Sequence, residues 1–134
     1  MPVKTLDHVN LRTAQLSEMR QFYTDVLGME AGPRPPFSFG GEWMYCDGHP
    51  IVHLVETRES AEKTGLSLEH FALRGEDMLG FSAHLRNLGV GYSVVTLPDF
   101  GDRQLHISDP DGNHIHVDFG PDEPGDVKNF SPEH

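Results

Sequence analysis

The chain has a single cysteine, Cys46, and no long hydrophobic run. One cysteine excludes an internal disulfide framework and is typical of proteins from a reducing compartment. The apolar stretches, such as 51–52 and 92–97, are far too short to span a membrane. The first residues also lack the apolar core of a secretion signal, so we expect a cytoplasmic protein with no membrane partner.

Positive charge is also scarce, with 10 lysines and arginines against 21 aspartates and glutamates. The resulting formal net charge of −11 argues against a nucleic-acid partner, because the phosphates would be repelled. Part of the acidic excess lies in the segment 120–134, which is rich in proline and glycine and has no apolar period. We expect this segment to be a mobile tail, or an arm that lies on a partner subunit.

An internal repeat organises the rest of the chain. The segment 6–12 aligns with 68–74 at an offset of 62, and apolar residues at alternate positions predict a strand in each. Apolar residues at helical spacing follow both strands and predict helices over 16–27 and 76–88. A glycine directly after each helical segment marks its end.

Further strand-like segments follow each predicted helix, with an Asp-Gly turn before the last strand of each half. They are 29–31, 42–46 and 50–56 in the first half, and 92–97, 103–108 and 114–119 in the second. The sequence therefore predicts an α+β fold of two tandem βαβββ modules, 3–57 and 67–119, within one domain over residues 1–119.

Four of the 9 histidines occupy matching positions in the two modules. His8 and His70 lie in the first predicted strands, and His53 and His116 lie in the last, with separations of 45 and 46 residues. Two modules related by a pseudo-twofold axis would bring these four side chains together. The common alternative is that each is an ordinary hydrogen-bonded histidine on a strand.

The residues that flank these histidines support a shared open face. They are apolar, and because side chains alternate across a strand they can pack under the helices while the imidazoles point away; they are Val9, Val52, Leu54, Phe71, Ile115 and Val117. Imidazole is the commonest neutral metal ligand, and several together suit divalent transition metals better than magnesium or calcium. We therefore predict a bound iron, zinc, nickel, cobalt or manganese ion.

Three motifs carry a resemblance to a known family: Leu6-Asp7-His8-Val9, the segment 22–29, and the segment 109–115 that begins Asp-Pro-Asp-Gly. In combination they resemble the vicinal-oxygen-chelate superfamily, which includes glyoxalase I, extradiol dioxygenases, fosfomycin-resistance transferases and bleomycin-resistance proteins. The resemblance implies an eight-stranded, cup-shaped mixed sheet with helices on its outer face, commonly completed across a homodimer.

The resemblance also implies metal ligands on the first and last strands of each module, which are His8, His53, His70 and His116 here. The family usually has glutamate at the position of His116, and glyoxalase I has glutamate or glutamine at that of His53. Without a metal-bound carboxylate as base, lactoylglutathione isomerisation is disfavoured. Four bound histidines would leave two positions of an octahedral ion free; if only three bind, His53 becomes an outer partner or an acid/base group.

Other polar and aromatic residues are candidates for the same site. His106 and His114 are candidate proton carriers, Gln104 a candidate substrate contact, and Asp118 a candidate partner that orients His116. The alternative for each is a surface or cross-strand hydrogen bond.

The loop 32–41 carries Arg34, Phe37 and Phe39. It is stiff in its proline half and hinged at its glycines, so we expect either a lid that presents these side chains to a substrate or a loop anchored by its aromatics. Cys46, for which no activating base is identifiable, is expected to be a small buried side chain.

We therefore expect a metal-dependent enzyme that acts on a small oxygen-chelating substrate, most like the extradiol dioxygenase branch. A metal-assisted lyase, isomerase or hydrolase is the second hypothesis. A metal-free, small-molecule-sequestering protein of the bleomycin-resistance type is the third, although such a protein has no need of converging histidines. A protein that uses the metal structurally is a further alternative.

Overall fold

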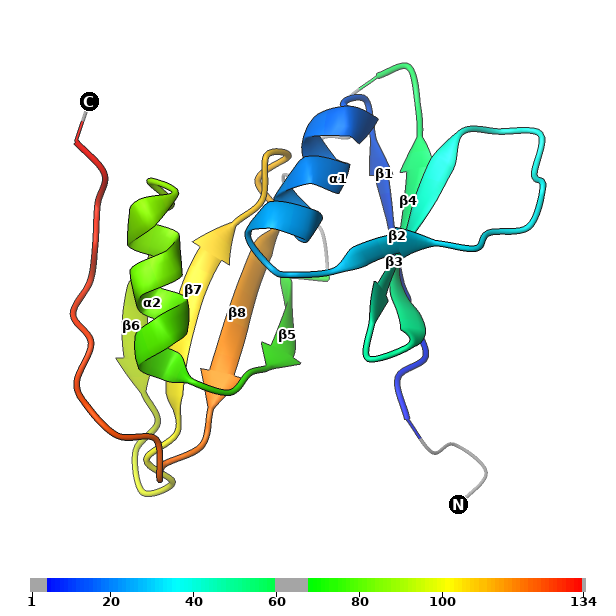
Figure 1. Cartoon of the computed structure of the whole chain (residues 1–134). Helices are drawn as coiled ribbons and strands as arrows, with labels where there is room; N and C mark the ends of the chain where they lie inside the picture. Colours follow the sequence, from blue (N-terminus) through cyan, green and yellow to red (C-terminus); the bar gives the residue numbers. More distant parts are fainter. Residues whose placement is uncertain (1–4, 60–67, 134) are drawn as a thin grey trace. The chain divides into compact units, whose positions relative to one another are not determined.

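The computed structural model describes residues 5–59 and 68–133 (Figure 1). The predicted starts of the two modules, at residues 3 and 67, and the last residue of the predicted tail lie outside these ranges. The chain divides into two compact units, Met1–Lys63 and Thr64–His134. No helix in the described part of the chain is long and apolar enough to cross a membrane.

Each unit contains the same series of elements. The first has β1 (Val9–Thr13), α1 (Leu16–Asp25), β2 (Glu30–Gly32), β3 (Gly41–Cys46) and β4 (His49–Glu56). The second has β5 (His70–Arg74), α2 (Met78–Asn87), β6 (Ser93–Thr96), β7 (Arg103–Ser108) and β8 (His114–Phe119). This confirms the α+β fold of two βαβββ modules.

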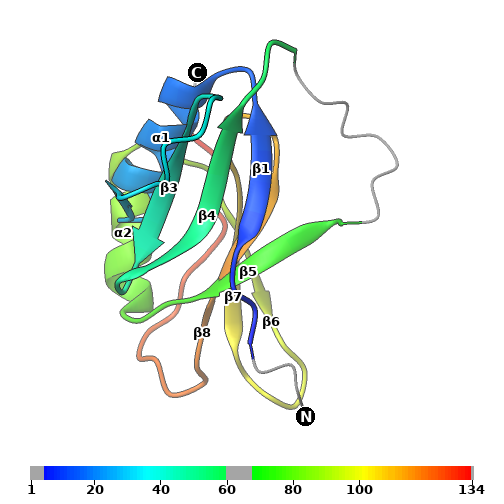
Figure 2. The same ribbon diagram turned by 90° about the vertical axis from the view of Figure 1, so that its right-hand side faces the viewer.

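Each unit forms one mixed four-stranded sheet, with strand orders β1-β4-β3-β2 and β5-β8-β7-β6. The first and last strands of each unit run parallel, and the remaining pairs are antiparallel. In the first unit β1, β4 and β3 lie side by side, with α1 on one face (Figure 2). The parallel pairing places the first and last strands next to each other, which is where the candidate histidines lie.

The helix-covered face of each sheet holds the apolar core. Side chains at alternate strand positions are buried there, as the period of two predicts; they are Met44, Val52 and Leu54 in the first unit and Leu105, Ile107, Ile115, Val117 and Phe119 in the second. From the helices come the buried side chains of Met19, Tyr23, Met78 and Leu85. The opposite face of each sheet is left to the intervening residues.

The helices are shorter than the sequence pattern predicts, and each ends a few residues before its expected glycine. Gly28 follows α1 with a φ of 73°, and the amide of Met29 donates to the Tyr23 carbonyl at 2.9 Å. Gly89 follows α2 with a φ of 71°. A residue with a side chain rarely adopts this left-handed conformation, so glycine at these positions lets the chain turn back into the sheet.

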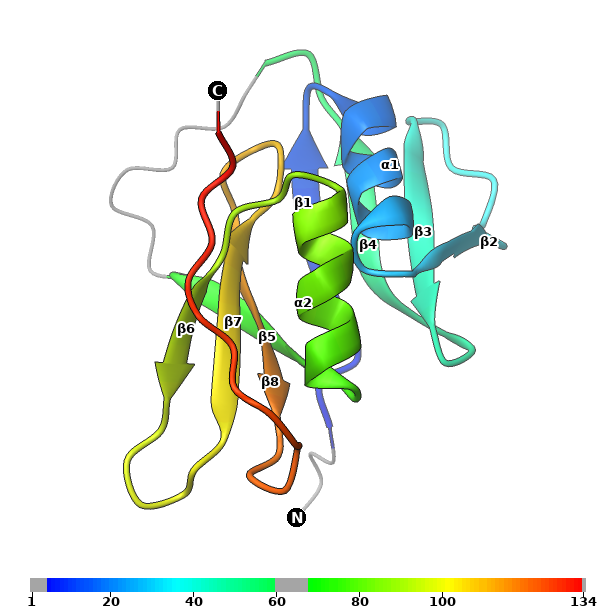
Figure 3. The same cartoon turned by 60° about the vertical axis from the view of Figure 1, so that its left-hand side comes forward.

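The C-terminal segment differs from the mobile tail expected from its composition. It runs beside β6 of its own unit (Figure 3), where Phe130 pairs with Tyr92 and the Asn129 side chain accepts from the Val94 amide at 2.7 Å. Arg103 donates to the Gly125 carbonyl at 2.8 Å. Composition predicted mobility because the segment has no apolar period, but backbone and side-chain hydrogen bonds hold it instead.

The same segment also completes the start of α2. Asp77 has a φ of 62°, and its side chain accepts from the Gly80 amide at 3.1 Å. Glu123 accepts from the Met78 amide at 2.8 Å. These carboxylates satisfy amides that have no partner within the helix, and their negative charge suits the positive end of the helix dipole.

Cys46 is exposed, which is different from the buried side chain expected. It is the last residue of β3, directly before the hairpin turn at Asp47 and Gly48, whose φ values are 51° and 78°. A side chain at a hairpin tip lies beyond the area that the helix covers, so the alternation of the strand does not bury it.

Candidate functional site

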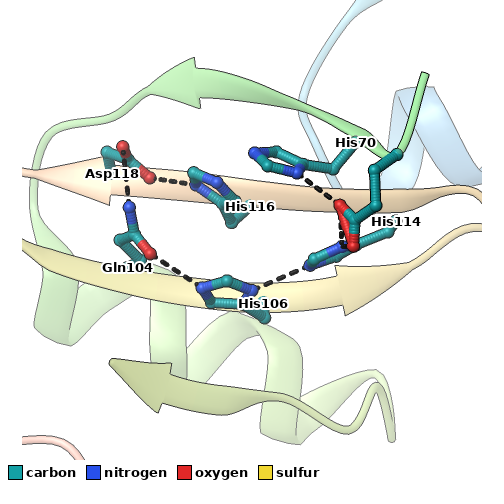
Figure 4. Close-up of polar contacts among 7 residues, drawn as sticks. His70, Gln104, His106, His114, His116 and Asp118 are labelled. Atoms are coloured by element: carbon teal, nitrogen blue, oxygen red, sulfur yellow. Dashed lines mark hydrogen bonds and ion pairs between the residues drawn. The ribbon is translucent and has the colours of Figure 1, made fainter. Parts of the chain in front are cut away.

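The open face of the second sheet carries six polar side chains from three adjacent strands (Figure 4). They are His70 on β5, Gln104 and His106 on β7, and His114, His116 and Asp118 on β8. The register places His116 opposite His106, and His114 opposite His70. Because these residues alternate with the buried apolar ones, the same pattern that builds the core gathers the polar group.

A tight loop before β8 sets the position of its histidines. Asp109 is buried, and its Oδ1 accepts from the amides of Asp111 at 3.0 Å and Asn113 at 2.9 Å. Its Oδ2 accepts from the Asn113 side chain at 2.7 Å. Gly112 supplies a φ of 81°. The Asp-Pro-Asp-Gly motif therefore fixes where β8 begins, and with it the face on which His114 and His116 lie.

Two histidines of this face are each held by a carboxylate. His116 donates from Nδ1 to the Asp118 carboxylate, and His70 donates from Nδ1 to Glu69 at 2.5 Å. A carboxylate can only accept, so each ring carries its proton on Nδ1 and keeps its lone pair on Nε2. This carboxylate–imidazole arrangement is the one in which metal-binding histidines are usually held. The ring centroids of His70 and His116 lie 4.6 Å apart.

A continuous chain of hydrogen bonds joins the remaining side chains of this face. The Gln104 amide nitrogen donates to Asp118 at 3.5 Å, and its oxygen accepts from His106 Nε2 at 2.9 Å. His106 Nδ1 and His114 Nε2 lie 2.8 Å apart. His114 Nδ1 lies 3.1 and 3.2 Å from the two oxygens of Glu69. The predicted proton carriers and the predicted substrate contact thus belong to one network.

The electrostatics of the network favour a charged carboxylate and a neutral His106. The hydrogen bond from His70, followed by that from His114, holds the pKa of Glu69 below its usual value. Burial lowers the pKa of His106, and the nearby His116 lowers it further.

In the first unit, His53 lies between two other rings. Trp43 stacks on one side with ring centroids 4.0 Å apart, and His8 stacks on the other at 3.9 Å. Its Nε2 donates to the Pro50 carbonyl at 3.0 Å, which leaves the lone pair on Nδ1. Burial is the largest cause that lowers the pKa of His53, followed by the charge of His8. The ring is therefore held in its neutral form.

His8 is the more exposed member of this stack. Its Nδ1 lies 2.8 Å from Asp7, and its side chain is 39% exposed. The hydrogen bond with His8 is the main cause of a lowered pKa of Asp7. His8 precedes the first residue of β1, although the sequence pattern placed it within the strand.

The donor set fits a divalent transition metal, but not equally in the two units. Each of the four predicted ligands offers an imidazole nitrogen, and in His70 and His116 the other nitrogen is tied to a carboxylate. The rings of His8 and His53 are parallel within 9°. Lone pairs lie in the ring plane, so stacked rings cannot both reach an ion at about 2.0–2.1 Å unless one of them turns. The four predicted ligands form two pairs, His8 with His53 in the first unit and His70 with His116 in the second.

The candidate substrate residues form an aromatic cluster in the first unit. Phe37 and Phe39 stack with centroids 4.9 Å apart, and the Arg34 guanidinium lies 5.0 Å from the first ring and 5.3 Å from the second. Arg34 also donates to the Phe39 carbonyl at 2.8 Å. The ring centroid of Phe37 lies 6.4 Å from that of Trp43. Trp43 in turn stacks on His53, so the cluster lies close to this histidine. Both phenylalanines are exposed.

Three participants were not singled out by the sequence pattern. Asp7 and Glu69 each bind the histidine that follows them, and Trp43 covers His53. The repeat contained a usable signal, because Asp7 and Glu69 occupy equivalent positions in the aligned segments. No comparable signal pointed to Trp43, whose contact depends on the register between β3 and β4.

The family model described as the glyoxalase/bleomycin resistance protein/dioxygenase superfamily matches residues 5–117. No curated protein sequence matches the chain at a significant level. Among solved structures, an integron cassette protein from the mobile metagenome of the Halifax Harbour sewage outfall is 25% identical, with a TM-score of 0.72 over 87% of this chain and 99% of the other.

Two further structures share the fold at lower identity. A lactoylglutathione lyase from Agrobacterium tumefaciens is 21% identical, with a TM-score of 0.69 over 90% of this chain and 97% of the other. A genomically encoded fosfomycin resistance protein from Listeria monocytogenes is 16% identical, with a TM-score of 0.68 over 88% and 94%. At these identities the likeness concerns the fold and not the reaction.

Proposed function

Because the chain belongs to the glyoxalase/bleomycin resistance protein/dioxygenase superfamily, we propose that it is a metal-dependent enzyme that acts on a small oxygen-chelating substrate. The proposed ligands are His8, His53, His70 and His116. The observation that carries the proposal is that one carboxylate binds Nδ1 of His70 and another binds Nδ1 of His116. Each contact leaves Nε2 of the ring with the lone pair that a metal needs. A simple binding protein has no need of such an arrangement.

A divalent ion held by neutral imidazoles would keep its full charge, polarise a substrate oxygen and lower the pKa of bound water. The chain's own contribution is the network beside it. His106 is neutral at its lowered pKa and carries its proton on Nε2, so its Nδ1 can accept a proton from His114 across their contact. Gln104 orients His106 through the hydrogen bond at Nε2.

The proposed reaction is most like that of the extradiol dioxygenase branch. In such a reaction a chelating substrate and oxygen both bind to open positions on the metal ion. Lactoylglutathione isomerisation stays disfavoured, since the positions of His53 and His116 offer no carboxylate base. The likeness to a lactoylglutathione lyase structure at 21% identity concerns the fold.

The aromatic cluster of Arg34, Phe37 and Phe39 is proposed to contact the substrate. Two exposed stacked rings offer an apolar face to a planar molecule, and the guanidinium beside them offers a positive charge to an anionic group. A small planar substrate with acidic oxygens would satisfy the cluster.

A metal-assisted lyase, isomerase or hydrolase is the second candidate, favoured by the all-imidazole ligand set, which resembles that of zinc sites that activate water. Oxygen consumption separates the two, because only ring cleavage by a dioxygenase consumes it. We also propose a homodimer, which size-exclusion chromatography with light scattering would test.

The deciding experiment is metal analysis of protein purified without affinity chelation, in the wild type and in the variants His116→Ala and His114→Ala. The proposal predicts near-stoichiometric metal that is lost on His116→Ala and kept on His114→Ala. Less than about a tenth of an equivalent in the wild type, even after reconstitution, would refute a metal-dependent enzyme and favour a metal-free sequestering protein.

A further inference from the structure

The outer edge of β6 is covered by the C-terminal segment of the same unit (Figure 3). β6 is an end strand of the second sheet, and β7 lies on its inner side. On its outer side the amide of Tyr92 donates to the Phe130 carbonyl at 2.9 Å, and the amide of Phe130 donates to the Tyr92 carbonyl at 3.0 Å. These two bonds form an antiparallel bridge, so the segment contacts the edge as a partner strand would.

Two neighbouring contacts show how closely the segment fits this edge. The amide of Val94 donates to the Asn129 side chain at 2.7 Å. A Cβ atom at Gly91 would lie 3.1 Å from the Pro132 side chain and 3.3 Å from the Phe130 carbonyl. The segment therefore lies directly on the backbone beside β6 and leaves no room for another strand there.

Charge distinguishes β6 from the other edge strands. The edge strands of the two described sheets are β1, β2, β5 and β6. β1 contains Arg12, β2 contains Glu30 and β5 contains Arg74. The stretch 91–97, which includes β6, has neither a charged residue nor a proline. Charges and prolines on an edge strand oppose its pairing with another chain, and β6 has no such protection of its own.

The composition of this stretch also favours pairing with a copy of itself. Tyrosine, valine and threonine are strand-forming residues, and they occupy four of the positions in 91–97. Uncharged stretches of about six or seven such residues without proline pair readily with identical stretches. Two identical strands can pair antiparallel about a twofold axis, which makes the edge self-complementary. Of the four edges, the C-terminal segment covers the one with this property.

We propose that the C-terminal segment blocks a self-association edge, and that its release lets β6 of one chain pair antiparallel with β6 of a second copy. The backbone groups of Tyr92 and Val94 that now bond to the segment would bond to the partner strand instead. The partner is therefore this same chain, and the segment decides whether the edge is available to it. No metal takes part in these contacts.

A double substitution in the full chain, Asn129→Ala with Phe130→Pro, releases the segment from β6. It removes the acceptor of the Val94 amide and the donor to the Tyr92 carbonyl. The contact of Glu123 with the start of α2 comes from an earlier part of the segment and does not involve β6, so the helix keeps it. We call this protein the release variant.

Light scattering over a range of protein concentrations measures the association. The mean mass of the release variant should rise at least about twofold above that of the wild type at the same high concentration. Hydrogen exchange gives a second readout. At low concentration the Val94 amide of the release variant should exchange about tenfold faster than in the wild type, because its hydrogen bond is lost. At high concentration it should be protected again by the partner strand.

A further substitution at Val95 shows whether β6 is the contact. Val95→Lys in the release variant should abolish the rise in mass, because the two copies of residue 95 lie close together in an antiparallel pair centred on β6. Val95→Thr, the matched uncharged control, should keep the rise. The side chain of Val95 is exposed, so neither substitution disturbs the core.

Three results would overturn the proposal. They are an unchanged exchange rate of the Val94 amide in the release variant, faster exchange without a rise in mass, and a rise in mass that persists with Val95→Lys. Each mass is compared with that of the wild type at the same concentration. A wild type that is monomeric or binds no metal would therefore count against the proposed function alone.

Discussion

The indole ring of Trp43 lies parallel to the imidazole of His53, with centroids 4.0 Å apart and 12° between the planes. His8 covers the opposite face of the same imidazole at 3.9 Å. The stack removes His53 from water, and this burial is the main reason that its pKa is lowered. Of the four predicted ligands, His53 is therefore the one that is held by rings on both of its faces.

The variant Trp43→Ala should raise the pKa of His53 toward the ordinary histidine value of about 6.5, because water would reach the ring. Proton NMR titration of the histidine ring signals in metal-free protein measures this. Trp43→Phe keeps an aromatic cover and should titrate close to the wild type. Identical midpoints in all three proteins would show that the stack does not control the pKa.

The same shift has a consequence for stability. Since the folded-state pKa of His53 lies below the unfolded value, the unfolded chain binds more protons as the pH falls through about 6.5, and the wild type loses stability there. Trp43→Ala should lose less stability between about pH 7.5 and about pH 5.5, although its stability at neutral pH should be lower. Urea unfolding at the two pH values measures the difference between the proteins.

Removal of single histidines should reveal unequal ligands. His8→Ala or His70→Ala should abolish metal binding, whereas His53→Ala should only weaken it. The reason is that Trp43 and Pro50 hold the His53 ring in place. Calorimetric titration measures the affinities. Equal losses from all three replacements would show that the ligands are equivalent.

Asp118→Ala should weaken metal binding by about 10–100-fold, the range typical of partners that orient a metal-binding histidine. The carboxylate fixes the proton of His116 on Nδ1, and without it the ring can rotate and change tautomer. Asp118→Asn retains an accepting oxygen and should lose less affinity. Asp126→Asn, on the exposed C-terminal segment, is the charge control and should bind as the wild type does.

Asp109→Ala should destabilise the protein by about 2–4 kcal/mol, because it removes a buried carboxylate and leaves partly buried amides without their acceptor. Asp109→Asn keeps one accepting oxygen for those amides and should cost less. Urea unfolding gives the free energies. A loss below about 0.5 kcal/mol for Asp109→Ala would mean that the loop before β8 does not depend on this side chain.

Glu123→Ala should lower the free energy of unfolding by about 1 kcal/mol, since Glu123 accepts from the first amide of α2. Glu133→Ala near the chain end is the matched control. Hydrogen exchange should show faster exchange of the Met78 amide in Glu123→Ala alone. Unchanged protection at Met78 would argue that the C-terminal segment does not stabilise the helix.

Much of the fold was predictable because apolar residues recur with the period of a strand or with that of a helix. The alternation in 103–108 and 114–119 predicted strands whose bounds agree with β7 and β8. The helices were found, but their ends were not, since frayed turns and capping depend on partners such as Glu123, which is distant in sequence. The burial of Cys46 was predicted wrongly because alternation alone does not say where the helix cover ends.

The C-terminal segment shows the limit of composition as a guide. Its proline, glycine and charge indicated mobility, yet Phe130 pairs with Tyr92 and Asn129 binds the Val94 amide. These contacts join residues more than thirty positions apart, and no local pattern encodes them.

By itself, the sequence determined which residues share a face: a period of two places His114, His116 and Asp118 on one side of β8 and Ile115 and Val117 on the other. Only the tertiary structure decided what each ring nitrogen binds. The partners come from neighbouring strands whose register is set by the turns and by the packed core, so the pairing of His106 with His114, and of His53 with Trp43, appears only once the sheets have formed.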